Sequence, residues 1–585
     1  MAIEKPLPVR MTLHGLLLAG AVIFSLPFMW MVGTSLMADK ELFGEGFHMM
    51  PRRPIPRTHS PYVDDRHFPE MDRPDYVSRD DWTEWKRKVR STVRTVARRH
   101  IQPASPTTTQ TTTSSSQDPP PTWPVGVDAS IVEPELLEGL WSKLRTQISQ
   151  EAWRSGSVDE IVEEIRTKTR PQDVRDALEG CYRRLALGNV QVRTKQFRQF
   201  KLDPVDPNLT PGQAWRVLDG SVRLLPAGES EDQHHVLSYD LTTHPRLEVA
   251  ATFRLPEDVE WDGIQSIRIN RCDDETYHQM RLYVETDGKL FETRDRIYTQ
   301  GYQWGETQLR AYDPAVDDSF RIRTWEYLYV ADTGEKYDHG DRVIRIRAVV
   351  EKSGDLEAWY GKARANYVHA LRYLPFWRYA ATSAAVVILS ILLNLLSCSL
   401  VAFAFARLRW PGRDLCFVIL LATLMIPAEV TMIPGFVIIK TLGWYNTLTP
   451  MWIGACFGSA FFIFLLRQFM KGIPQDLEDA ARIDGCGFLR IYWHVMLPLV
   501  KPTLAAIAIF TFMGVWNNFM TPLIYVNDQR LYPLALGLFA FQTVSGGNHA
   551  AMMAASLIMT TPVIVIFFFA QKYFIQGVML TGMKA

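Results

Sequence analysis

Acidic residues gather in residues 472–502, which read GIPQDLEDAARIDGCGFLRIYWHVMLPLVKP. Asp476, Glu478 and Asp479 stand in the opening turns of a helix that the pattern predicts there. The helix dipole stabilises carboxylates at this end, and carboxylates form ion pairs with basic groups. The chemistry that this spacing offers is therefore charge-based docking of a partner.

A glycine elbow is expected to shape the same segment. Pro474 suits the first helical position, and Gly485 suits the C-terminal stop of the first helix. Residues 488–496 are predicted to form a second helix that ends before Pro498. The segment is thus predicted to fold as helix, glycine elbow and helix.

Six apolar runs long enough to cross a bilayer surround this segment and must position it. They are residues 11–32, 379–405, 414–439, 450–469, 503–526 and 552–574. The first run is long for a signal peptide and lacks a small-residue cleavage pattern, so we expect it to remain as a transmembrane helix. The pattern predicts an α-helical membrane protein with six transmembrane helices.

Basic residues near the ends of these runs predict their orientation, because cytoplasmic loops carry an excess of Lys and Arg. These residues are Lys5, Arg10, Arg407, Arg409, Arg413, Arg467, Lys471, Arg482, Arg490 and Lys572. They all mark the same side, which places both termini in the cytoplasm. Residues 472–502, between the fourth and fifth runs, are then cytoplasmic too.

Several motifs of this segment occur in a familiar order. They are Asp479-Ala480-Ala481, Asp484-Gly485, Leu497-Pro498-Leu499 and Lys501-Pro502. The set resembles the cytoplasmic "EAA" loop of binding-protein-dependent ABC importer permeases, most closely the maltose-type carbohydrate branch. Asp479 stands where that loop usually has Glu, although Glu478 precedes it. The likeness extends over residues 1–43 and 365–585, with further motifs at 425–434 and 516–523.

This resemblance implies the ABC importer permease fold and a subunit that transports carbohydrate across the cell inner membrane. The implied partners are an ABC ATPase dimer, a second permease subunit, an extracytoplasmic solute-binding protein, the carbohydrate and membrane lipid. The implied ATPase-coupling residues are Glu478, Asp479, Ala480, Ala481, Asp484, Gly485 and Pro498.

The chain contains no GxxxxGK[ST] phosphate loop, so ATP is expected to bind to the partner. We therefore expect a transport subunit that is not an enzyme and has no cofactor of its own. The 63 basic and 63 acidic residues balance, which gives no indication of a nucleic-acid partner.

Four polar residues fall in or near the apolar runs, where an unpaired polar group is expensive. They are Asn394, Glu429, Asn517 and Asn518. Two interpretations stay open for each residue, a translocation path and hydrogen bonding that packs helices together.

A polar stretch of about 320 residues separates the first two apolar runs, a large departure from the carbohydrate permeases. The topology predicts that it is an extracytoplasmic insert of α plus β-sandwich type. The expected parts of the chain are 1–42 (N-terminus and first helix), 43–131 (insert with a disordered Pro/Ser/Thr linker near 102–124), 132–189 (helical), 190–351 (β-sandwich-like) and 366–585 (permease domain).

The function of the insert stays open at the level of sequence. Its aromatic residues are candidates for stacking on sugars, although core packing is the commoner role: Trp261, Tyr277, Tyr283, Tyr298, Tyr302 and Trp304. Cys181 and Cys272 are candidates for a disulfide if the insert is extracytoplasmic. A membrane-anchored glycan-binding or sensor protein is the alternative function, and a secondary transporter is a third.

Overall fold

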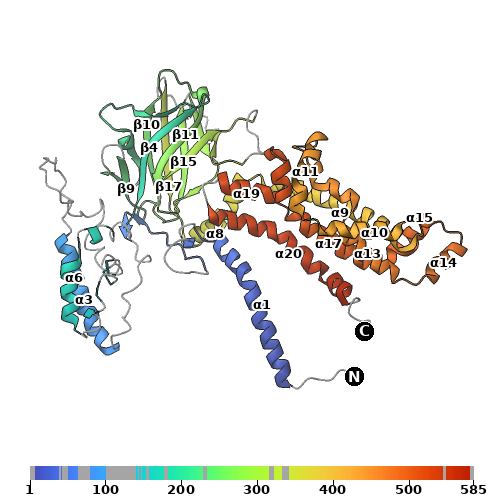
Figure 1. Cartoon of the computed structure of the whole chain (residues 1–585). Coiled ribbons are helices and arrows are strands. Elements are labelled where there is room, and N and C mark those ends of the chain that lie inside the picture. Colours follow the sequence, from blue (N-terminus) through green and yellow to red (C-terminus); the bar gives the residue numbers. More distant parts are fainter. Residues whose placement is uncertain are drawn as a thin grey trace. The chain divides into compact units, whose positions relative to one another are not determined.

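The computed structural model shows two units, each compact by itself (Figure 1). The helical unit comprises residues 1–51, 316–324 and 364–585, and the β-rich unit comprises residues 52–315 and 325–363. The structure describes residues 7–38, 41–42, 50–63, 79–100, 140–141, 144–145, 148–149, 151–152, 157–170, 172–174, 176, 182–227, 233–286, 288–302, 304–314, 322–331, 342–544 and 548–579.

The helical unit is built from long apolar helices and several short ones. The long helices are α1 (Leu7–Ser35), α9 (Phe376–Arg407), α10 (Arg413–Ala422), α11 (Ala428–Thr441), α13 (Ala460–Lys471), α17 (Lys501–Trp516), α19 (Leu534–Val544) and α20 (His549–Met579). Short helices are α12 (Thr449–Trp452), α14 (Asp476–Ile483), α15 (Phe488–Ile491), α16 (Leu497–Leu499) and α18 (Met520–Tyr525). Helix α8 (Asp355–Tyr373) carries the chain from the β-rich unit into the helical unit.

Four stretches of the described chain are long and apolar enough to cross a membrane, and two bent pairs of helices bring the number to six if each pair is one span. The four are His14–Ser35, Phe376–Arg407, Thr449–Lys471 and His549–Phe569. The bent pairs are Arg413–Met425 with Ala428–Thr441 and Phe488–Leu499 with Lys501–Trp516.

Two predicted runs differ from straight spans. Residues 414–439 bend by 101° between Met425 and Ala428, because Pro427 has no N–H and disfavours helical geometry at the residue before it. The run 503–526 is interrupted, since α17 ends at Trp516 and α18 begins at Met520. Asn518 accepts the Thr521 N–H in this break, which replaces a helical hydrogen bond.

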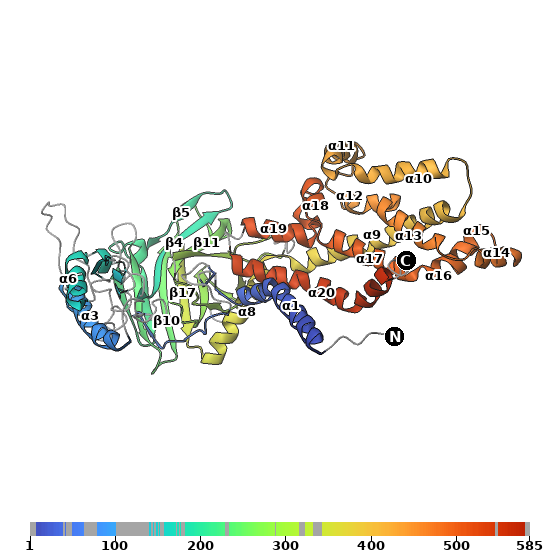
Figure 2. The same cartoon turned by 60° about the horizontal axis from the view of Figure 1, so that its bottom comes forward.

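Helix α9 is central in the helical unit. It packs against α13 and α17, and α20 packs against α1, α17 and α19 (Figure 2). One buried cluster joins the C-terminal half of α9 to α13 and to the segment that follows residue 488, through residues such as Phe403, Leu466 and Tyr492. This cluster fixes the base of the segment in which the acidic residues lie.

The β-rich unit contains one continuous sheet of 15 strands. The main path runs β1-β9-β4-β11-β15-β16-β13-β12-β17-β10-β6, with β14, β5, β7 and β8 pairing beside it. The strands of this sheet are β1 (His59–Ser60), β4 (Leu185–Thr194), β5 (Gln199–Lys201), β6 (Asp203–Pro204), β7 (Trp215–Asp219), β8 (Val222–Ala227), β9 (His234–Asp240), β10 (Arg246–Arg254), β11 (Ile264–Cys272), β12 (Gln279–Thr286), β13 (Lys289–Thr293), β14 (Ile297–Tyr298), β15 (Trp304–Ala311), β16 (Glu326–Val330) and β17 (Val343–Glu351).

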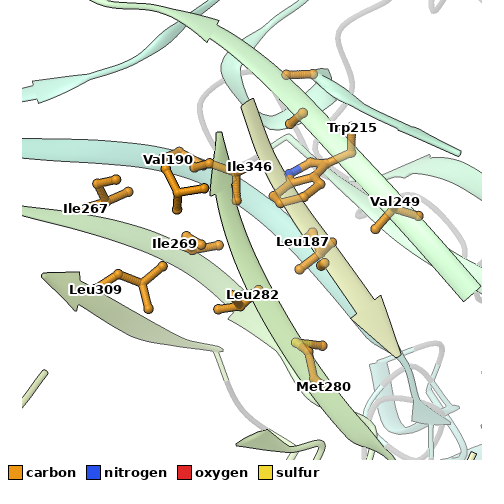
Figure 3. Close-up of a cluster of buried hydrophobic side chains, with 14 of the residues drawn as sticks. Leu187, Val190, Trp215, Val249, Ile267, Ile269, Met280, Leu282, Leu309 and Ile346 are labelled. Atoms are coloured by element: carbon orange, nitrogen blue, oxygen red, sulfur yellow. The ribbon is translucent and has the colours of Figure 1, made fainter. Parts of the chain in front are cut away.

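Successive side chains of these strands point to opposite faces of the sheet, and the apolar side chains on one face form the core of the unit. Leu247, Val249, Ala251 and Phe253 of β10 all belong to it. Figure 3 shows side chains from several strands meeting around Trp215, whose Nε1 donates a hydrogen bond to the Gly188 carbonyl at 2.9 Å. The core is therefore enclosed by residues that lie far apart in the sequence.

The predicted strands at 246–253, 264–269, 280–284 and 343–350 are confirmed. The sandwich was expected to be antiparallel, and one pair in the sheet, β15 with β16, is parallel. The part 132–189 was predicted to be helical, but its last residues belong to the sheet. Strand β4 begins at Leu185, and Leu185 and Leu187 are buried in the core of the β-rich unit.

Two helices make a smaller cluster in the β-rich unit. Helices α3 (Arg79–His100) and α6 (Val158–Lys168) lie side by side (Figure 1). Val89, Val93 and Ile161 are buried in this part. The predicted linker near 102–124 and Cys181 lie outside the described residues, so the pairing of Cys181 with Cys272 stays a prediction.

Candidate functional site

The predicted elbow is present in the structure. Helix α14 ends with the Cys486 N–H bonded to the Ala481 carbonyl at 2.9 Å and the Gly485 N–H bonded to the Arg482 carbonyl at 3.0 Å. This pattern is a Schellman motif, which needs a left-handed residue after the helix. Gly485 supplies it with φ +77°, and its lack of a Cβ permits that conformation.

The helix boundaries differ from the prediction on both sides of the elbow. Helix α14 begins at Asp476, so Pro474 lies before the helix and not at its first residue. The second arm does not end before Pro498. It continues from α15 through a π-helical turn (Tyr492–Met496) into α16. Pro498, which has no N–H to donate, lies at the second residue of α16, directly after the π-helical turn.

Glu478 is buried, with only 3% of its side chain exposed. Its Oε1 accepts a hydrogen bond from Arg482 Nη2 at 2.6 Å, and its Oε2 lies 3.8 Å from Arg407 Nε. Arg407, at the end of α9, also donates from Nη2 to the carbonyls of Met470 and Ile473, each at 2.6 Å. A buried carboxylate needs such partners. Glu478 therefore ties the elbow to α9.

The outer face of the elbow combines acid with apolar surface. Asp476, Asp479 and Asp484 are exposed, as are Ala480 and Gly485, while Ala481 is half-buried. Large apolar side chains are exposed beside them: Leu477, Ile483, Phe488, Leu489 and Trp493. Ile483 is 87% exposed. Exposed apolar groups in a segment rimmed by polar residues are typical of a surface that contacts another protein or a membrane.

Ser399 is a further contact between the elbow and α9. Its hydroxyl lies 2.6 Å from the Tyr492 hydroxyl in a buried position. Sequence reasoning used Arg407 only to orient the first membrane runs, and it missed both Arg407 and Ser399 as supports of the elbow. The only sequence signal was a basic residue at the end of an apolar run, which many helices carry.

The four polar residues of the apolar runs have separate partners. Asn394 of α9 is buried, and its Nδ2 donates to Thr511 Oγ1 of α17 at 2.9 Å. Asn517 donates to the Met513 carbonyl within its own turn at 3.0 Å, and Asn518 bonds to Thr521. Glu429 is exposed in the first turn of α11. Of the four, Asn394 forms a hydrogen bond between two long helices, and these hydrogen bonds do not join the four residues into one path.

The aromatic residues of the insert are distributed over different environments. Trp261 packs against Phe291 of the core, with ring centroids 4.9 Å apart. Tyr277 is buried. Tyr283 lies on the other face of β12 from the core residues Leu282 and Val284, and the guanidinium of Arg347 lies over its ring at 4.7 Å. In the residues that the structure describes, no group of three or more His, Cys, Asp or Glu side chains is suited to hold a metal ion.

Comparison with known proteins places the C-terminal part in a family. Residues 398–579 match the family described as "Binding-protein-dependent transport system inner membrane component". The matched range contains the elbow, Arg407 and the two bent helix pairs.

Curated relatives agree with this match. The chain is 36% identical over 209 residues to the arabinooligosaccharides transport system permease protein AraQ of Halalkalibacterium halodurans, covering 36% of this chain and 75% of the relative. It is 34% identical over 177 residues to the diacetylchitobiose uptake system permease protein NgcG of Streptomyces coelicolor, covering 30% of this chain and 59% of the relative.

A solved structure is also similar, that of a bacterial ABC transporter involved in the import of the acidic polysaccharide alginate. The sequence identity is 28%, the TM-score is 0.33, and the match covers 36% of this chain and 79% of that chain.

Proposed function

The chain belongs to the family of binding-protein-dependent transport system inner membrane components, and on this premise we propose that it is a permease subunit of a carbohydrate importer. The names of its relatives support the substrate class, since they transport arabinooligosaccharides and diacetylchitobiose. The subunit is a multi-pass protein of the cell inner membrane, with both termini in the cytoplasm.

The elbow is the site at which a partner ATPase drives this subunit. One observation carries this proposal: of two acidic residues that are adjacent in the sequence, Glu478 is buried against the helices and Asp479 is exposed on the surface of the elbow. Asp479 and Asp484 meet basic groups of the ATPase, and Ile483 enters an apolar depression between them. The small side chains of Ala480 and Ala481 permit close approach.

Arg407 transmits the motion of the elbow to the membrane helices. It contacts Glu478 of the elbow, the carbonyl of Met470 in the last turn of α13 and the carbonyl of Ile473 just after that helix. The Ser399–Tyr492 contact adds a second link to α9. A displacement of the elbow by ATP-driven closure of the ATPase pair therefore moves α9 and α13 together, and alternating access follows from this rigid-body motion.

The assembly contains a second permease subunit, two copies of the ATPase and an extracytoplasmic solute-binding protein. ATP binds to the ATPase, and this subunit needs no cofactor of its own. Pro498 contributes by holding the start of α16, which leads into α17.

Uptake by proteoliposomes tests the proposal. The chain is co-expressed with a candidate second permease and ATPase, purified, and reconstituted with the solute-binding protein and a labelled oligosaccharide. Uptake that requires ATP supports the importer. Uptake that follows an ion gradient and ignores ATP depletion contradicts it, and a chain that purifies without any ATPase favours a membrane anchor.

A matched pair of variants tests the docking surface. Ile483→Glu introduces a charge at a side chain that is 87% exposed on the elbow, and Leu356→Glu does the same at a side chain that is 88% exposed on α8. We expect only Ile483→Glu to lose the ATPase during purification. Equal retention of the ATPase by both variants contradicts docking at the elbow.

A further inference from the structure

One edge of β10 in the β-rich unit is shared by two short strands. Strand β6 pairs with the end of β10 at Phe253 and Arg254, and β7 pairs with residues 248–251. The connection between them, residues 205–214, leaves the sheet and returns to it. A cavity of about 480 Å³ lies beside this connection, within the range of about 300–1,000 Å³ that is usual for ligand sites.

Small side chains make room for the cavity. Ala250 and Thr252 line it from β10, where they alternate with the core residues Val249, Ala251 and Phe253. Larger residues at these two positions would fill the space. The cavity is thus a consequence of the sequence of β10 and of the split pairing at its edge.

Arg345 of β17 forms one wall, directly opposite Thr252 in the strand register. Its Nη1 lies 3.6 Å from Oε2 of Glu285, whose side chain is only 2% exposed. Glu285 also lies 3.3 Å from Arg347 Nε, which keeps the carboxylate in place. This contact engages one Nη atom of Arg345, and a guanidinium carries five N–H donors. Arg345 therefore lines the cavity while the buried Glu285 holds its guanidinium.

Arg216 and Asp206 line the cavity nearer to solvent, with 67% and 39% of their side chains exposed. Arg216 Nη2 lies 3.2 Å from Asp206 Oδ2. The other oxygen of Asp206 accepts hydrogen bonds from the backbone N–H and the side chain of Asn208, so this carboxylate also shapes the connection.

The charge of the lining selects the ligand. Two guanidinium groups and one carboxylate line the cavity, so the lining residues themselves carry a net positive charge, while the carboxylate of Glu285 lies behind Arg345. Guanidinium groups bind carboxylates in a planar, two-point geometry. The remaining walls are apolar, with Val205, Leu209 and Leu218 among them, and they suit the C–H surface of a sugar ring.

We propose that this cavity binds an acidic saccharide, with Arg345 and Arg216 holding the carboxylate of a uronic-acid unit. The choice of a sugar rests on the proposed carbohydrate transport, whereas the choice of a carboxylate rests on the lining charges alone. The site lies entirely in the β-rich unit, so it recognises saccharide separately from the membrane helices.

Direct binding to the purified full-length chain tests this proposal. The probe is a trimer of galacturonate, and its carboxyl-reduced neutral trimer is the control. We expect the acidic trimer to bind at least tenfold more tightly than the neutral trimer, and we expect added salt to weaken its binding. Equal binding of the two trimers, or no binding of either, overturns the site without affecting ATP-driven uptake.

Two variants break the same exposed ion pair and separate the charge effect from loss of structure. Arg216→Gln should weaken binding of the acidic trimer several-fold, because it removes a donor to the carboxylate. Asp206→Asn should strengthen it or leave it unchanged, because it removes a repelling charge and retains an oxygen for Asn208. Equal weakening by both variants contradicts recognition of a carboxylate.

Discussion

Replacing Glu478 with glutamine should loosen the elbow far more than replacing its neighbour Asp479 with asparagine. Both changes remove one negative charge from the same helix turn and keep the size of the side chain. Glu478 is 3% exposed and contacts Arg482 and Arg407, whereas Asp479 is exposed. The pair of variants therefore isolates the buried contacts.

The expected magnitude follows from the two partners. Removing one member of a buried ion pair costs about 3–5 kcal/mol, and an exposed pair contributes about 0–1 kcal/mol. Arg482 is 45% exposed and Arg407 keeps two carbonyl acceptors, so the loss lies between these limits. We expect Glu478→Gln to lower the free energy of local opening by about 2–3 kcal/mol, and Asp479→Asn to lower it by less than about 1 kcal/mol.

Hydrogen exchange of the full-length protein, followed by mass spectrometry, measures this opening. Because about 1.4 kcal/mol is a factor of ten, amides of residues 476–491 should exchange about 30- to 150-fold faster in Glu478→Gln. Asp479→Asn should change them by less than about fivefold. In the assembled importer, both variants should reduce ATP-driven uptake, the first by loosening the elbow and the second by weakening the contact with the ATPase.

Equal exchange in the two variants would refute the reasoning, because it would mean that burial of Glu478 contributes nothing to the elbow. Faster exchange in Asp479→Asn alone would do the same. Peptides from β10 and β17 provide the internal control, since neither substitution touches the β-rich unit.

Three further predictions concern other residues. Gly485→Val should abolish uptake while membrane insertion is retained. Gly485 has φ +77° and a left-handed L-residue costs about 1–2 kcal/mol, whereas Gly487→Val, at φ −75°, should keep most activity in the same uptake assay. Asn394→Ala should destabilise the purified protein by about 0.6–1.7 kcal/mol, because the hydrogen bond to Thr511 is lost. The measurement is the midpoint of thermal unfolding, which should fall. In a Thr511→Val background the same substitution should cause no such fall, because the hydrogen bond is already missing. Burial, helped by nearby Asp274 and opposed by Arg271, raises the pKa of Asp273 to about 7. Its stabilising contribution is complete below the ordinary value of 3.8 and is fully lost once the pH has risen past about 7. Protection of β11–β12 amides should therefore fall between pH 3.8 and about 7 in the wild type and stay level above that, and Asp273→Asn should remove this dependence.

The sequence predicts the local features of the elbow well because they depend on neighbouring residues. Gly485 after a short helix that opens with acids is enough to predict a stop and a turn. Alternation along 246–253 and 343–350 likewise predicts strands, since each residue only has to point to one of two faces. The ordered motifs of the loop also indicate the family, which the comparisons confirm.

Tertiary structure decides what each of these residues faces. Glu478 and Asp479 are adjacent acids, and only the arrival of Arg407 from the end of α9 makes one buried and leaves the other exposed. The joining of β15 to β16 and the cavity beside the connection between β6 and β7 have the same origin. Local sequence patterns determine which helices and strands form. Which side chains are buried, and which residues they contact, depends on packing between elements that are distant in the chain, and this packing exists only in the folded molecule.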